Sequence, residues 1–123
     1  KGGEADEAVA RAAIRALGRC GTDAEAPLIK LLNKKTAEDL RRAEAAKQLL
    51  LIGGARGDAA VAKALETLGD PSLVRRLVAS AKAAAEPTPA LLSALCQVSA
   101  DLPALRSSVA DTLRTIAPGT TCE

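Results

Sequence analysis

The sequence predicts an all-α fold in which antiparallel helix pairs stack into an α-solenoid, a right-handed superhelix of about seven helices. The chain of 123 residues is 48% hydrophobic, and most of these residues are Ala, Leu, Val or Ile, of which Ala and Leu strongly favour helix. No segment shows the sustained alternation or the β-branched and aromatic runs that indicate strands. Four times a helix-capping residue precedes an arginine by five positions, at starts 30, 34 and 31 residues apart: Asp6 and Arg11, Thr36 and Arg41, Asp70 and Arg75, Asp101 and Arg106. A period near thirty residues is typical of stacked helical repeats.

Apolar periodicity and terminating residues define the expected helices in order. Their approximate bounds are 6–19, 22–33, 36–52, 58–68, 70–86, 88–99 and 101–117. Glycines end the first and third, and Thr22 and Thr36 open the second and third with the spacing of a capping box. Asp70 and Thr88 each precede a proline at the first helical position, and Asp101 caps the last helix. The connections are short, so successive helices are expected to be antiparallel neighbours.

The segment Val9–Gly21 reads V-A-R-A-A-I-R-A-L-G-R-C-G and resembles the second helix of a HEAT repeat. It is most similar to the short variety named after phycobilisome lyases, whose pattern is V-R-x-A-A-x-x-A-L-G-x-I-G. Residues 22–32 resemble the first helix of the next unit, and the likeness weakens after Pro71. The resemblance implies one HEAT-like repeat domain over residues 1–123 that serves as a scaffold or protein-binding surface. Because the first residue is Lys1 and not Met, we expect this domain to be a fragment of a longer chain.

The resemblance also implies a binding face. In HEAT-like folds the second helix of each unit lines the inner surface, where the phased arginines would form a column. We expect this column to bind an acidic peptide or protein surface through bidentate contacts. Its expected members are Arg11, Arg15, Arg42, Arg75, Arg76 and Arg106. The alternative is a structural ladder, in which each arginine pairs with an aspartate or a backbone carbonyl of the neighbouring repeat. Because the chain begins with a helix of the second type, that helix is either a terminal cap or the remnant of a truncated array.

The composition argues against an enzyme, a cofactor and a metal site. There is no histidine, so the usual general base and the commonest metal ligand are both missing. We expect Cys20 and Cys96 to be packed as small apolar side chains and Cys122 to be an exposed thiol, with a disulfide or a metal site as the alternative. The lack of a paired-cysteine motif favours a reducing compartment such as the cytoplasm.

The leading functional hypothesis is therefore a monomeric, non-enzymatic scaffold that binds a protein. The alternative is a structural spacer or regulatory repeat segment within a larger enzyme or sensor. A nucleic-acid-binding array is disfavoured, because the net charge is only +2 and no aromatic residue is present to stack on bases. The longest strongly apolar run, Leu49–Ile52, is too short to cross a membrane.

Overall fold

The computed structural model describes residues 2–67 and 70–122, with side chains from residue 6 onward. These ranges contain seven α-helices, three short 3-10 helices and no strand, which confirms the all-α prediction. The α-helices are α1 (Gly2–Gly18), α2 (Glu25–Leu32), α3 (Asp39–Ile52), α4 (Ala55–Thr67), α5 (Pro71–Ser80), α6 (Pro89–Asp101) and α7 (Arg106–Ile116). The 3-10 helices are η1 (Gly21–Ala24), η2 (Ala81–Ala83) and η3 (Pro103–Leu105). The expected end of the fourth helix at residue 68 lies outside the described residues.

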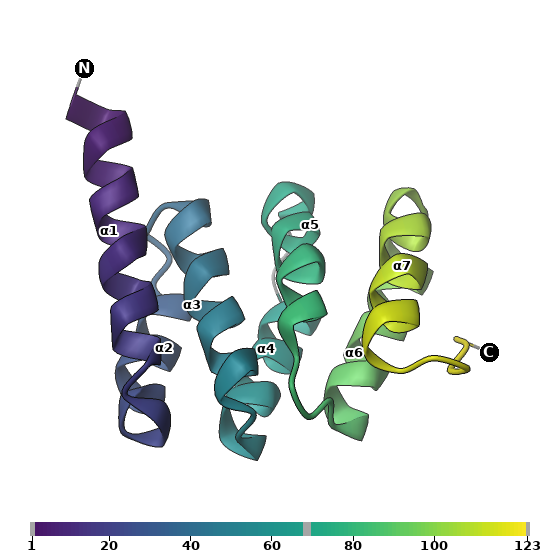
Figure 1. Ribbon diagram of the computed structural model, residues 1–123. Coiled ribbons are helices and arrows are strands. Elements are labelled where there is room, and N and C mark those ends of the chain that lie inside the picture. The colour runs from purple at the N-terminus through teal and green to yellow at the C-terminus, as the bar shows by residue number, and fades with distance from the viewer. Residues whose placement is uncertain (1, 68–69, 123) are drawn as a thin grey trace.

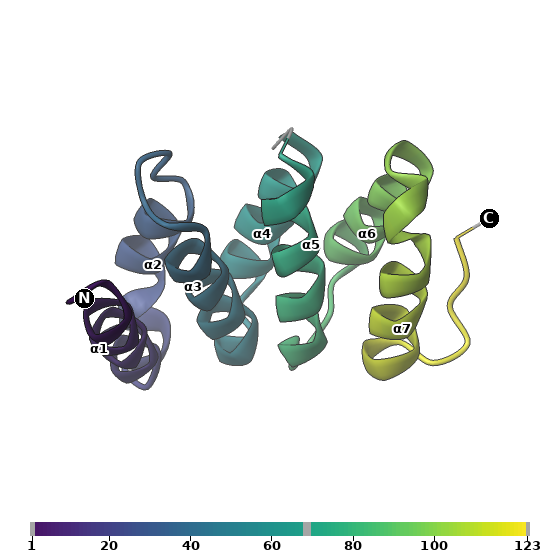
Figure 2. The same ribbon diagram turned by 90° about the horizontal axis from the view of Figure 1, so that it is seen from above.

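The helices form two rows (Figures 1 and 2). The odd row contains α1, α3, α5 and α7, and the even row contains α2, α4 and α6. Each helix packs against the next member of its own row, and α3 also packs against both α2 and α4. Leucine and valine side chains fill the space between the rows. The largest fully buried ones are Leu28, Leu32, Leu49, Leu50, Leu73, Leu77, Leu91, Leu95, Leu105, Val61, Val74 and Val78.

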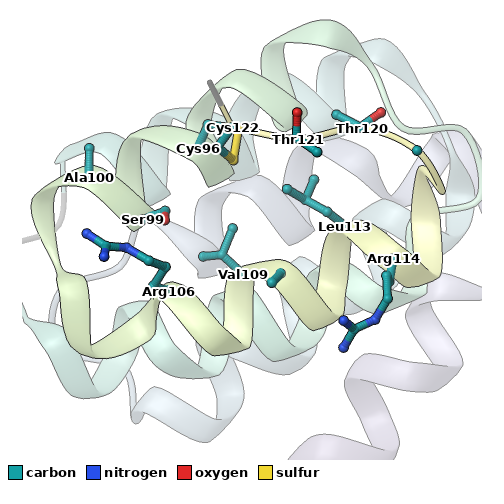
Figure 3. A pocket seen from close by; sticks show the side chains of 12 residues that line it. Cys96, Ser99, Ala100, Arg106, Val109, Leu113, Arg114, Thr120, Thr121 and Cys122 are labelled. Carbon is teal, nitrogen blue, oxygen red and sulfur yellow. A yellow bond between two sulfur atoms is a disulfide. The ribbon is translucent and has the colours of Figure 1, made fainter.

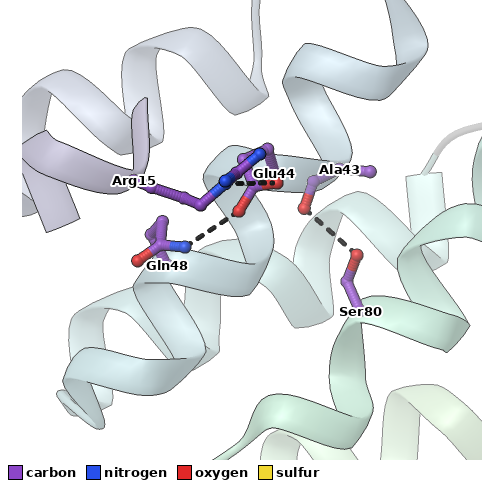
Figure 4. Close-up of polar contacts among 5 residues, drawn as sticks. All are labelled: Arg15, Ala43, Glu44, Gln48 and Ser80. Atoms are coloured by element: carbon purple, nitrogen blue, oxygen red, sulfur yellow. Dashed lines mark hydrogen bonds and ion pairs between the residues drawn. The ribbon is translucent and has the colours of Figure 1, made fainter. Parts of the chain in front are cut away.

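Hydroxyl groups link neighbouring helices of the odd row. The Ser80 hydroxyl, at the end of α5, donates to the backbone carbonyl of Ala43 in α3 at 3.1 Å (Figure 4). One step further along the row, the buried Thr112 hydroxyl in α7 donates to the carbonyl of Val78 in α5 at 3.0 Å. The same kind of bond therefore joins α3 to α5 and α5 to α7.

In the even row, carboxylate side chains link neighbouring helices. Glu25, at the start of α2, is buried against Gly54, which directly precedes α4. Asp58, in the first turn of α4, accepts a hydrogen bond from the backbone N–H of Thr88, the N-cap of α6, at 3.2 Å. In both cases an acidic side chain near the start of one helix reaches the start of the next, where the helix dipole favours negative charge.

The predicted N-caps are confirmed at the two helices in which a proline follows the capping residue. The Asp70 side chain accepts from the N–H of Ser72 and the Thr88 side chain from that of Leu91. The two capping boxes are wrong, because α2 and α3 begin at Glu25 and Asp39 without a side-chain cap bond. Before α2 the chain instead makes the 3-10 turn η1, which starts at a glycine of positive φ. The expected caps Asp6 and Asp101 are also wrong: Asp6 lies within α1 and Asp101 is the last residue of α6.

The bonding and the exposure of the cysteines differ from the expectation of two packed cysteines and one exposed thiol. Cys96 in α6 is bonded to Cys122, and the tail after α7 returns along these helices to make that link (Figure 3). Cys20 is exposed and free, because it lies in the turn after α1 rather than on a packed helix face. The tail's path brings together two residues that are 26 positions apart, which no local pattern indicates.

The buried hydroxyl bond in the odd row can be tested by Thr112→Val, which keeps the shape of the side chain and removes the donor. We expect this change to lower the free energy of unfolding by about 1 kcal/mol, because the Val78 carbonyl, which also accepts from the Ala81 backbone N–H, loses its bond to α7. Urea unfolding followed by circular dichroism measures the change. Thr115→Val is the matched control, since the exposed Thr115 hydroxyl bonds only within α7. Equal losses in the two variants would show that the inter-helix bond contributes nothing.

Asp58 gives the fold a pH dependence. The residue is fully buried, and its Oδ1 atom has no partner among the described residues. Burial raises the pKa of Asp58 above its ordinary value of 3.8; the hydrogen bonds from Thr88 oppose this rise, and the nearby Glu86 charge adds to it. The folded protein thus holds the neutral carboxyl more readily than the unfolded chain does. The stability contributed by Asp58 is therefore present below the unfolded pKa and is lost as pH rises through the folded pKa.

Asp58→Asn should separate this effect from the titration of other groups. The free energy of unfolding of the variant minus that of the wild type should increase as pH rises from about 4 to about 7, because Asn carries no charge to bury. Urea unfolding at a series of pH values measures the difference. A difference that stays constant or decreases with pH would contradict the stated role of Asp58.

Candidate functional site

The six predicted arginines do not form one surface, and Arg42 is the clearest exception. Only 6% of Arg42 is exposed, and its Nε donates to the carbonyl of Leu32, the last residue of α2, at 2.8 Å. A guanidinium at a helix C-terminus satisfies a carbonyl that has no partner within the helix and also complements the helix dipole. The expectation that Arg42 belongs to an exposed stripe is therefore corrected, because this side chain joins α3 to α2.

Two arginines of the N-terminal part, Arg15 and Arg41, are paired with carboxylates within the fold. Arg15 of α1 lies 3.6 Å from Glu44 of α3, and Glu44 also accepts from the Gln48 amide at 2.8 Å (Figure 4). Arg41 of α3 donates to Glu7 of α1 at 3.0 Å. Two ion pairs thus connect the same two helices in opposite directions. These two arginines therefore contact neighbouring helices, as in the structural ladder that we considered as the alternative to a binding face, although their partners are glutamates.

The arginines of the C-terminal part are different. Arg75, Arg76 and Arg106 are exposed, and none lies within 4.0 Å of a carboxylate among the described residues. Moreover, the segment that contains α5 and η2 has three basic residues and no acidic one, the third basic residue being Lys82. Positive charge that is not neutralised internally therefore gathers on the second half of the odd row.

A shallow groove between α3 and α5 collects several of these cations. We define the α3–α5 groove by the residues that line two adjoining hollows of about 460 and 180 Å³: Arg11, Leu40, Ala43, Glu44, Lys47, Arg76, Ala79, Ser80, Lys82 and Ala83. Lys47, Ala79 and Ser80 line both hollows, so the two are continuous. Arg76 also borders a third hollow, of about 560 Å³, against the loop that precedes α3, and the lining of this hollow includes the carboxylates of Glu7, Glu38 and Asp39.

The lining of the α3–α5 groove favours an anion. It includes four cationic residues, Arg11, Lys47, Arg76 and Lys82. The single carboxylate of the lining is that of Glu44, which already pairs with Arg15. Alanines and one serine separate the cations, so an extended backbone can approach closely.

Sequence reasoning found two of the four groove cations, Arg11 and Arg76, and missed both lysines. The available signal was the absence of acidic residues from 71–83, together with the position of Lys47 one helical turn after Ala43. Arg75 and Arg106 do not line the groove, although both belong to helices of the odd row.

Comparison with known proteins gives no relative: no family model, no curated protein and no solved structure matches the chain. Among the described residues, no cluster of three potential metal ligands occurs. None of the helices in the described ranges has both the length and the apolar character that a membrane span requires.

The different roles of Arg42 and Arg75 can be measured directly. We expect Arg42→Ala to lower the free energy of unfolding by about 1.5–3 kcal/mol, because it leaves the Leu32 carbonyl without its charged donor. Arg75→Ala, the same substitution at an exposed site on the next helix of the row, should change it by less than about 0.5 kcal/mol. Urea unfolding of both variants provides the comparison. Similar values for the two would refute the structural role of Arg42.

Proposed function

We propose that this protein is a non-enzymatic interaction module, an α-solenoid of HEAT-like repeats that binds an acidic peptide segment of a partner protein. The observation that carries the proposal is the α3–α5 groove, in which four cationic side chains surround a floor of small residues. Arg75 and Arg106, on the same row, extend the basic surface beyond the groove. A bound peptide would place carboxylates on the guanidinium and ammonium groups and its backbone over the alanines.

Recurrence along each row supports the repeat architecture. Equivalent hydroxyl-to-carbonyl bonds join successive helices of the odd row, and acidic side chains near the start of two successive even-row helices reach the start of the next. Interactions of this nearest-neighbour kind are what a stacked array requires. The resemblance of Val9–Gly21 to a HEAT helix, and the expected right-handed superhelix, agree with this interpretation.

An acidic peptide suits the groove better than a nucleic acid does. The net charge of the chain is only +2, whereas binding of a polyanionic backbone generally uses a broad basic surface. The chain also has no aromatic side chain on which an unpaired base could stack. A few clustered cations match a short acidic segment.

The alternative function is a structural spacer within a larger protein. The paired arginines of α1 and α3 favour it, because there the charges serve the fold itself. The unpaired cations in the C-terminal half of the odd row distinguish the two functions, because a binding module uses them and a spacer does not need them.

The proposal predicts a charge-dependent peptide affinity that is specific to one face. We expect an Asp- and Glu-rich peptide, labelled for fluorescence anisotropy, to bind the protein and to bind more weakly as salt increases. The double variant Arg76→Glu with Lys82→Glu should lose at least about tenfold in affinity, as expected when charge-assisted contacts are replaced by repulsion.

The control is Arg56→Glu with Lys63→Glu, which makes the same charge change at exposed positions of α4 in the even row. This variant should bind within about twofold of wild type, because neither Arg56 nor Lys63 lines the groove and exposed charges away from the contact are screened by salt. Equal weakening by both variants would show a nonspecific response to net charge and contradict the proposed groove. No binding by the folded wild-type protein would favour the spacer.

A further inference from the structure

A second cavity, partly open to solvent, lies at the opposite end of the molecule from α1, where α6, α7 and the C-terminal tail border it. Its volume is about 580 Å³, which is within the range of small-molecule sites in proteins. Residues 119–122 of the tail form one wall, and the Cys96–Cys122 disulfide ties that wall to α6 (Figure 3). The cavity shares no residue with the α3–α5 groove.

The lining of this cavity is apolar with a polar edge. Ala100 of α6 and Ala110 of α7 are exposed and contribute accessible apolar surface, while Val109 and Leu113 lie almost fully covered beneath it. Ser99 of α6 contributes a hydroxyl that makes no side-chain hydrogen bond within the described ranges. Arg106 contributes a charged group at the exposed edge. The lining residues that the structure describes include no carboxylate, so this part of the cavity combines an apolar surface with positive charge.

The two arginines of the lining are not equivalent. Arg114 forms an ion pair with Asp111, one turn earlier in α7. Arg106 has no such pair among the described residues and remains available to a ligand. A ligand's negative charge is therefore expected at the Arg106 side of the cavity.

From these features we infer that the α6–α7 cavity binds a small amphipathic carboxylate. The alkyl chain lies on Ala100 and Ala110, above the covered Val109 and Leu113, and the carboxylate accepts from the Arg106 guanidinium and the Ser99 hydroxyl. A helix of another protein or of a second copy fits less well, because the disulfide-tied tail already crosses the open side of α6 and α7. A simple inorganic anion would leave the apolar surface unused.

The disulfide makes the cavity sensitive to redox conditions. A dithiol reductant transfers two electrons and two protons to the Cys96–Cys122 bond, which gives two thiols, while the reductant becomes a disulfide. The tail then loses its covalent tie to α6 and the cavity loses a fixed wall. Ligand affinity should therefore be higher in the oxidised protein.

Titration of the oxidised protein with decanoate, followed by ¹H–¹⁵N NMR and calorimetry, tests the inference. Decanoate should shift the amide signals of the cavity lining, and 1-decanol, which lacks the charge, should bind more weakly. Arg106→Gln should weaken decanoate binding at least about tenfold. Arg56→Gln, an exposed arginine of α4, should leave the affinity unchanged. Shifts confined to other parts of the chain, or equal affinity of the Arg106→Gln variant, would overturn the inference.

The contribution of the tail is tested separately with the double variant Cys96→Ser and Cys122→Ser. It should bind decanoate at least about threefold more weakly than the oxidised wild type, as should the wild type treated with dithiothreitol. Circular dichroism establishes that the variant is folded, and light scattering reports the oligomeric state. Unchanged affinity in the folded variant would show that the tail is not a wall of the site. Dimerisation without decanoate shifts in the cavity would identify the surface as an interface between copies and overturn the inference.

Discussion

The structure depends on the small size of its apolar side chains. With no aromatic residue and no methionine, no apolar side chain of the core is larger than leucine or isoleucine. Such side chains fill only a thin space, so each helix must find its neighbours at short range. Two rows of helices, each packed against the next, satisfy this condition, whereas a deep single core does not. The alanines of α3 illustrate it, since Ala45 and Ala46 are fully buried between neighbouring helices.

Thin packing makes polar contacts between neighbouring helices important. Close helices place a hydroxyl or carboxylate of one within reach of the backbone of the next, as at Thr112 and Asp58. In the N-terminal half two arginines follow the same rule: Arg15 of α1 is paired with a carboxylate of α3, and Arg41 of α3 with a carboxylate of α1. In the C-terminal half the carboxylates are missing from α5, so its cations face solvent. The basic groove thus lies between α3, whose Glu44 is paired with Arg15, and α5, which has no carboxylate of its own.

The sequence predicted what depends on local chemistry. The helix-forming composition, the order of the helices and the proline-preceded caps at Asp70 and Thr88 all follow from interactions within a few residues, but the expected fifth helix to residue 86 ends at Ser80 and the expected seventh from residue 101 begins at Arg106. It failed at Thr22 and Thr36, because the tertiary path of the chain into α2 and α3 replaced the local capping geometry. Arg41 and Arg42 show the limit for the site. They are adjacent and chemically identical, yet a rotation of about 100° around the helix places one beside α1 and buries the other against α2.

The disulfide also changes how the chain would bear mechanical load. A force applied at the C-terminus passes through Cys122 to Cys96 and enters the molecule at α6, so α7 lies outside the path of tension. The closed loop, whose ends are 26 positions apart, cannot lengthen while the bond is intact. When the molecule is stretched, α7 lies within the disulfide-closed loop and bears no force, whereas α6 does. The disulfide would therefore determine the order in which the helices unfold.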